Sequence, residues 1–169
     1  MPDPPPRTAR DRDPAGRARN ARPRDAAGRP LPRGAAGVER VPDDLVLDAD
    51  ESVTEAQRLL DAGLPFHAHE VLEAAWKAAP PAERELWRGL AQIAVGLTHL
   101  QRGNGRGAVA LLRRGAETAT AWRVGSVGPP PAGLQLDALV RGAEALAGRV
   151  EDGGPEAADP SDLRPRLRP

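Results

Sequence analysis

The chain has 169 residues, no cysteine and a formal net charge of zero, with 24 basic and 24 acidic side chains. This length fits one domain of ordinary size, and the lack of cysteine excludes disulfides, thiolate catalysis and thiolate metal ligands. No apolar run approaches the roughly 20 residues that a membrane-spanning helix needs. The arginine-rich start is not followed by an apolar stretch, so we expect a cytoplasmic protein without a secretory signal.

Residues 1–44 form the first region, and their composition predicts a disordered arm rich in arginine and proline. Residues 1–40 hold ten arginines and five acids but almost no large apolar side chain, so they cannot bury enough surface to offset the entropy of ordering. A solvated extension is therefore favoured. Nucleic-acid binding through the arginines is the alternative, although acids are interleaved and no aromatic side chain is available for stacking on bases.

The first helix is predicted over about 50–62, where apolar residues recur at helical spacing. Its start is open, because both Asp48 with Glu51 and Ser52 with Glu55 fit a capping box.

The second helix is predicted over 65–79, because Pro65 suits the first helical position and Pro80-Pro81 ends the pattern. At about 100° per residue, one side of this helix should face the core. That side carries Phe66, His69, Leu72, Glu73 and Trp76, with Ala68, Ala75 and Ala79 beside them. His67, Glu70 and Lys77 fall on the other side. A carboxylate that faces a core needs a partner, since a buried unpaired charge is costly.

The third helix is predicted to follow Pro80-Pro81 and to end near Arg102. Gly89 and Gly96 lie on one line of this helix. Because an interior glycine costs about 1 kcal/mol against alanine, the line suggests close approach by another backbone. Gln92 and His99 border the resulting groove.

Two further helices complete the pattern, over about 105–122, with Asn104 as a cap, and over about 133–149. Residues 151–169 return to glycine, proline and charge and are expected to form a disordered tail. The ordered domain is thus 45–150. The short connections favour antiparallel neighbours, so the expected fold class is all-α, a compact bundle of about five helices.

Two motifs in this order and spacing resemble the DUF309 family, a small helical domain named for its unknown function. The first motif matches the HE..LE..W signature of that family, and the second motif matches its Q…H…GN signature. The resemblance covers roughly 50–122 and implies an all-helical fold without an established reaction. The family motif maps onto Phe66, His69, Glu70, Glu73 and Trp76, and then onto Gln92, His99, Gly103 and Asn104.

The helical spacing and the family resemblance select the same polar residues. We hypothesise that His69 and Glu73 of the second helix face Gln92 and His99 of the third helix. The favoured interpretation is a structural network, in which Glu73 fixes a histidine tautomer and Gln92 completes the hydrogen bonds. The domain would then be a non-enzymatic structural or interaction module that needs no cofactor.

The alternative is a metal or hydrolytic site, with zinc or iron held by His69, Glu73 and His99. Its candidate catalytic residues are His69, Glu70, Glu73 and His99, with Glu73 or His69 as a general base. The Glu-x-x-His spacing of bundle metal sites is absent, since the order here is His-x-x-x-Glu.

An interaction module would use exposed side chains, and we expect His67, Glu70 and Lys77 to line the rim of a groove. A basic patch of Arg102, Arg106, Arg113 and Arg114 is a further candidate surface, although a solvated helix face explains it more simply. Homo-oligomerisation is compatible with so small a bundle. The sequence identifies no substrate, partner or membrane contact.

Overall fold

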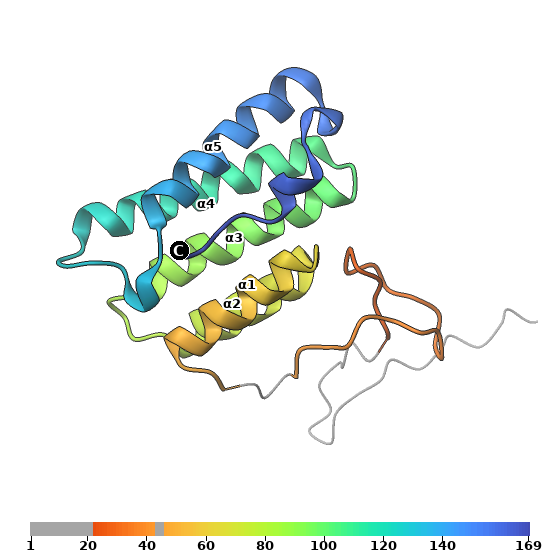
Figure 1. Ribbon diagram of the computed structural model, residues 1–169, viewed down its shortest axis with the longest axis horizontal. Coiled ribbons are helices and arrows are strands. Elements are labelled where there is room, and N and C mark those ends of the chain that lie inside the picture. Colours follow the sequence, from red (N-terminus) through yellow and green to blue (C-terminus); the bar gives the residue numbers. More distant parts are fainter. Residues whose placement is uncertain (1–21, 43–45) are drawn as a thin grey trace, which may run out of the picture.

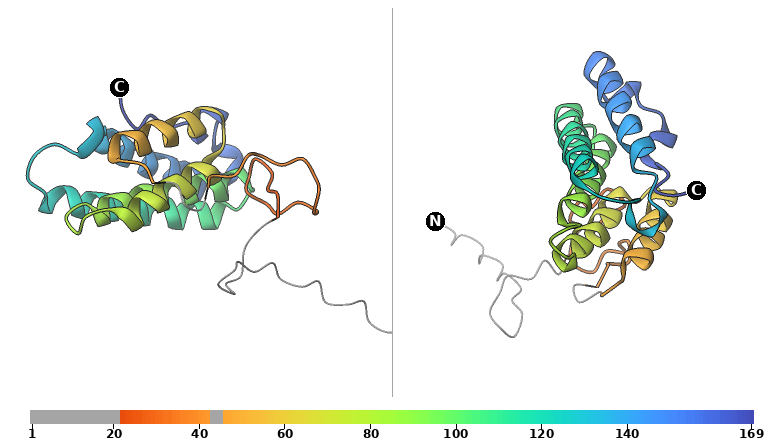
Figure 2. Two further views of the ribbon diagram at one scale, coloured as in Figure 1. Left: turned by 90° about the horizontal axis from the view of Figure 1, so that it is seen from below. Right: turned by 90° about the vertical axis from the view of Figure 1, so that its left-hand side faces the viewer.

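The computed structural model describes residues 22–42 and 46–169, and it confirms an all-α bundle of five helices in this part of the chain. Successive helices run in opposite directions and pack side by side (Figures 1 and 2). The described residues contain no strand, only two isolated bridges made by Arg24 to Pro30 and to Val38. Short 3₁₀ turns follow the fourth and fifth helices. The helices are α1 (Ala49–Asp61), α2 (Pro65–Ala78), α3 (Arg84–Gln101), α4 (Gly105–Gly125) and α5 (Leu136–Gly153), with η1 (Pro131–Gly133), η2 (Pro155–Ala157) and η3 (Pro160–Leu163).

The helix ends follow the caps in the sequence. Of the two capping boxes at the start of α1, the structure uses Asp48 with Glu51: the Glu51 N–H donates to Asp48 Oδ1 at 2.8 Å, and the Asp48 N–H donates to Glu51 Oε2 at 2.9 Å. Gly103 ends α3 with a φ of 73°, a conformation that glycine adopts without strain. Asn104 caps α4 by accepting the Gly107 N–H at 2.9 Å.

The predicted close approach of two backbones at the α3 glycines is confirmed, and the partner is α4. A Cβ atom at Gly89 would lie 3.0 Å from the Gly115 carbonyl oxygen, and one at Gly96 would lie 2.9 Å from the Leu112 nitrogen. Gly115 of α4 returns the contact, since its Cβ would lie 2.8 Å from the Gly89 carbonyl oxygen. At the α3–α4 seam, defined by these three glycines, the two helix backbones are therefore in close contact.

The core face of α2 agrees with the predicted one in Leu72 and the alanines but differs in its polar residues. The buried residues are mainly small ones that allow α2 to lie close to α1 and α3: Ala68, Val71, Leu72, Ala75 and Ala79. Glu73 keeps 35% of its side chain exposed, so it lies at the edge of the core. His67, predicted to be exposed, is fully buried. The helical wheel considered only one packing side, whereas the N-terminal segment packs on a second side of α2.

The described part of the N-terminal arm packs on the bundle. Residues 22–42, here called the strap, lie against the end of the bundle where α2 begins and α3 ends (Figures 1 and 2). Ala27 is buried, and its carbonyl accepts a hydrogen bond from Arg102 Nε at 2.8 Å. The strap is ordered by contacts distant in sequence, which its composition does not reveal. Residues 1–21 of the predicted arm, and Leu45 at the predicted start of the domain, lie outside the described residues.

The C-terminal segment, predicted as a tail from residue 151, also lies against the bundle. It turns back after α5 and crosses the bundle between α5 and α1 (Figure 1). Leu167 is buried, its N–H donates to Gln57 Oε1 at 2.7 Å, and its carbonyl accepts the Gln135 N–H at 2.8 Å. Asp162 pairs with Arg149 at 2.6 Å. One large apolar side chain and several paired polar groups thus order a segment rich in proline.

Candidate functional site

The site with the most specific contacts surrounds Phe66, at the first turn of α2. The strap makes a tight turn here, in which the Gly28 N–H donates to the Asp25 carbonyl at 2.9 Å. Gly28 has a φ of 72°, and a Cβ atom at this position would overlap the Phe66 ring. Glycine is therefore required twice, for the backbone conformation and for contact with the ring.

Two arginines flank the same ring. The Arg24 guanidinium carbon lies 4.9 Å from the Phe66 ring centroid and that of Arg102 lies 5.7 Å from it, both within cation–π range. Arg24 also donates from Nη1 to the Gly28 carbonyl at 2.5 Å, which closes the strap turn. Phe66 is thus held by one arginine of the strap and one from the end of α3.

His67 lies beside this contact and is fully buried. Its ring meets the Phe66 ring edge to face, with centroids 5.4 Å apart. Within residues 22–42 and 46–169, neither ring nitrogen has a hydrogen-bond partner. Burial lowers the pKa of His67, and the positive charge of Arg24 lowers it further, while Asp25 acts in the opposite direction. His67 is therefore held neutral next to the strap.

His69 and Glu73, the histidine and carboxylate of the first predicted motif, do lie together. His69 Nε2 is 3.4 Å from Glu73 Oε2, and Lys77 Nζ is 2.7 Å from Glu73 Oε1. Burial lowers the pKa of His69, whereas the Glu73 carboxylate and the Ala91 carbonyl oppose the shift. This partly buried pair joins the motif to a surface lysine.

Gln92 and His99 face α4 instead of α2. Gln92 Oε1 accepts a hydrogen bond from Thr118 Oγ1 at 3.1 Å, and His99 Nδ1 lies 2.9 Å from Asn104 Nδ2. They border the α3–α4 seam, as the glycine spacing predicted. The hypothesised quartet is therefore divided between two helix interfaces.

The metal alternative depends on His69, Glu73 and His99 meeting at one point. No group of three or more histidine, aspartate or glutamate side chains is placed to hold a metal ion within the described ranges. Glu70, the fourth candidate catalytic residue, is half-buried on α2.

The predicted basic patch is only partly free. Arg102 is engaged by the strap, and Arg113 forms a two-pronged ion pair with Glu151, with N–O distances of 2.8 and 2.6 Å. Arg106 and Arg114 are exposed.

Sequence reasoning missed Gly28, Arg24 and the role of Arg102. The available signal was a glycine between arginines in a segment otherwise assigned to disorder. That signal is weak, because the segment also contains Gly34, at which a Cβ atom would have no neighbour within 4 Å.

The fold and the site together define a small helical-bundle domain. A strap from the same chain packs against α2, the helix that carries the first motif. Residues 53–111 match the model of the family described as "Domain of unknown function (DUF309)", so this part of the chain is similar to that family. A curated relative, "Uncharacterized protein YpuF" of Bacillus subtilis (strain 168), is 46% identical over 48 residues. The match spans 28% of this chain and 28% of that relative, and no solved structure matches.

These comparisons confirm the resemblance seen in the sequence, and they assign no specific activity to the domain. None of the helices in the described part of the chain has the length and apolar character required to cross a membrane.

Proposed function

We propose that this DUF309-like domain is a non-enzymatic interaction module, and that its peptide site is the Phe66 end of α2. The observation that carries the proposal is the docked strap. An arginine-flanked glycine turn closes on Phe66 and is hydrogen-bonded to Arg102. The partner would present the same chemistry, a glycine turn with an adjacent arginine, and would replace the strap.

The contacts favour recognition of a peptide over catalysis. Arg102 donates a hydrogen bond to a backbone carbonyl of the strap. The Phe66 ring leaves room only for a residue without a side chain at the contact. Both arginines also make cation–π contacts with the ring, each worth about 0.5–2 kcal/mol. His67, the buried histidine nearby, has no carboxylate or nucleophile bonded to it in the described residues, so the base–nucleophile geometry of acid–base catalysis is not assembled there.

The strap itself provides the probe. A fluorescently labelled peptide with the sequence of residues 22–42 would be titrated into three full-length proteins: the unaltered chain, Gly28→Ala and Gly34→Ala. In the unaltered chain the tethered strap competes at an effective concentration on the order of millimolar. Gly28→Ala should weaken the tethered strap, because the new methyl overlaps Phe66. We expect it to bind the peptide at least about tenfold more tightly in anisotropy titrations.

Gly34→Ala is the matched control, because Gly34 also has a positive φ, 83°, but has no neighbour within 4 Å. It should bind like the unaltered chain. A peptide carrying alanine at the position of Gly28 should fail to bind any of the proteins. Arg24→Ala serves as a second way to loosen the strap if Gly28→Ala folds poorly. Equal affinity of all proteins for both peptides would overturn the proposal.

The cytoplasmic location expected from the sequence belongs to the same proposal. Fractionation of cells that express the chain, with the protein followed by immunoblot, would test it.

A further inference from the structure

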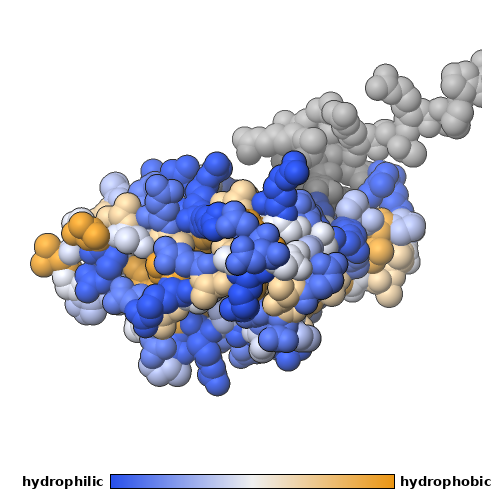
Figure 3. All heavy atoms as spheres, turned by 90° about the horizontal axis from the view of Figure 1, so that it is seen from above, coloured by the Kyte–Doolittle hydropathy of each residue, from blue (hydrophilic) through white to orange (hydrophobic). Residues whose placement is uncertain are grey.

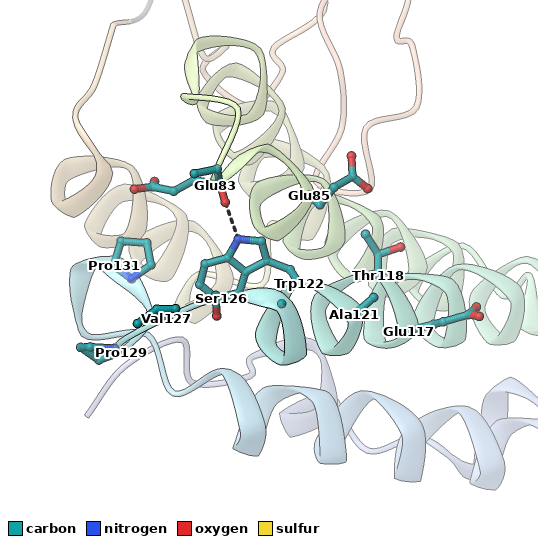
Figure 4. A pocket seen from close by; sticks show the side chains of 12 residues that line it. Glu83, Glu85, Glu117, Thr118, Ala121, Trp122, Ser126, Val127, Pro129 and Pro131 are labelled. Atoms are coloured by element: carbon teal, nitrogen blue, oxygen red, sulfur yellow. Dashed lines mark hydrogen bonds between the residues drawn. The ribbon is translucent and has the colours of Figure 1, made fainter.

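A second surface lies at the opposite end of the bundle from the strap. It is a groove of about 850 Å³ between the start of α3, the last turns of α4 and the α4–α5 loop. Figure 4 shows side chains from all three segments around it. The apolar wall consists of Trp122 from α4 with Val127 and Pro131 from the loop, and the acidic residues are Glu83 and Glu85 near the start of α3 and Glu117 on α4.

The walls of the groove are fixed before any ligand binds. Trp122 donates from Nε1 to the Ala82 carbonyl at 2.6 Å, shown by the dashed line in Figure 4. Trp87 donates from Nε1 to Glu83 Oε2 at 3.1 Å, which orients that carboxylate. Thr118, also in the lining, is bonded to Gln92 of the family signature. A preformed surface loses less conformational entropy on binding.

Apolar side chains are exposed at this end of the molecule. Val127 is fully exposed and Val124 is 82% exposed. Hydrophobic atoms are visible at the end of the molecule where the α4–α5 loop lies (Figure 3). The rest of that face is mostly hydrophilic in the same view. Exposed apolar residues rimmed by polar ones are typical of interaction sites.

The negative charge of the groove favours a partner that carries a positive charge. Its lining includes three glutamates, and none of the described lining residues is basic. Glu85 is paired with Arg88, at 3.2 Å, and both side chains are about half exposed. Glu117 has no ion pair in the described part of the chain. Complementary charge across an interface mainly sets partner choice and association rate.

We propose that this groove docks a segment of a protein partner in which an arginine or lysine stands beside an aliphatic residue. The aliphatic side chain would lie against Trp122 and Val127, and the cation would face Glu85 and Glu117, which lie on one side of the groove (Figure 4). This surface is separate from the Phe66 site, so each can bind without the other.

A random peptide library displayed on phage would be selected on the full-length protein. Enriched peptides would then be synthesised and titrated against the unaltered chain, Glu117→Arg, Val127→Asp and Glu144→Arg. Glu144 is an exposed glutamate of α5 outside the groove and provides the matched charge reversal. The first two positions are also exposed, so all variants should melt like the unaltered chain.

We expect enrichment of peptides with a basic residue next to an aliphatic one, with affinity reduced at least about tenfold by Glu117→Arg and by Val127→Asp. Glu144→Arg should bind them unchanged. Three outcomes would overturn the proposal: no enriched sequence, enrichment of acidic sequences, or equal affinity for all four proteins. The enriched peptides should also bind Gly28→Ala with unchanged affinity, which would show that the groove binds them independently of the strap site.

Discussion

The α3–α4 seam supports the sharpest stability prediction, because the chain offers a glycine of the same type outside the seam. Replacing Gly115 with alanine would place a methyl group 2.7 Å from Ile93 Cγ1 and 2.8 Å from both the Gly89 carbonyl oxygen and the Ile93 nitrogen. Two of these three atoms belong to a backbone, so the helices themselves must separate. Overpacking of this kind costs about 1–3 kcal/mol.

Helix propensity acts in the opposite direction, since alanine in a helix interior is favoured over glycine by about 1 kcal/mol. Gly142 of α5 isolates this gain, because nothing lies within 4 Å of a Cβ atom there. We therefore expect Gly142→Ala to stabilise the fold by up to about 1 kcal/mol. Gly115→Ala should instead be destabilised by about 1–3 kcal/mol, because full relief of the overlap would require α3 and α4 to move apart along the seam.

The measurement is urea unfolding of both variants, followed by circular dichroism and by tryptophan fluorescence to check for a single transition. Comparing the two variants removes the propensity term common to both. If Gly115→Ala were as stable as Gly142→Ala, the contact between the two backbones would not constrain the bundle, and our account of the seam would be refuted.

Three further predictions follow from the caps, the strap and the buried histidines. Asp48→Ala should cost about 1 kcal/mol in urea unfolding, because it removes the acceptor for the Glu51 N–H. Deleting residues 1–42 should lower the melting temperature, because it exposes Phe66 and His67, and an unchanged value would show that the strap adds nothing. Since the folded-state pKa of His67 is lowered from its usual 6.5, stability should be full above about pH 6.5 and should fall as the pH drops from there towards the folded-state pKa, by up to about 1.4 kcal/mol per pH unit. His67→Leu should reduce that slope when unfolding is measured from about pH 7.5 to about pH 5.5.

Helix positions were predictable because the residues that start and end the helices act locally. Pro65, the Pro80-Pro81 pair and Asn104 restrict the backbone within a few residues of themselves, and the observed boundaries lie close to the predicted ones. The two open capping boxes show the limit of this reasoning. Ser52 and Asp48 have equivalent local patterns, and the choice of Asp48 leaves Ser52 buried within the helix.

The partner of Gln92 and His99 could also have been predicted from the sequence. Residues 89, 92, 96 and 99 are spaced by three and four, so the polar pair lies on the same stripe as the two glycines. A helix that packs closely on the glycines must then be the helix that meets Gln92 and His99. The hypothesis of a quartet with α2 conflicted with this stripe, and the structure places α4 there.

Burial of His67 was not predictable from α2 alone. A helical wheel assumes one buried side, but this helix packs on the bundle with one side and lies near the strap with another. The second neighbour comes from residues whose composition resembles that of disordered chains. Its order depends on Phe66 and Arg102, far along the sequence, and no local pattern encodes that pairing.

The properties of His67 also bear on how firmly the strap is held. A buried polar group without a hydrogen bond costs about 1–3 kcal/mol, and in the described residues both nitrogens of His67 are in this position. The strap contact therefore contains an unfavourable contribution beside its favourable ones on Phe66 and Arg102. An apolar residue at position 67 would remove that cost and hold the strap more tightly. The observed histidine instead limits the net strength of the intramolecular contact, as the proposed displacement of the strap by a partner peptide would require.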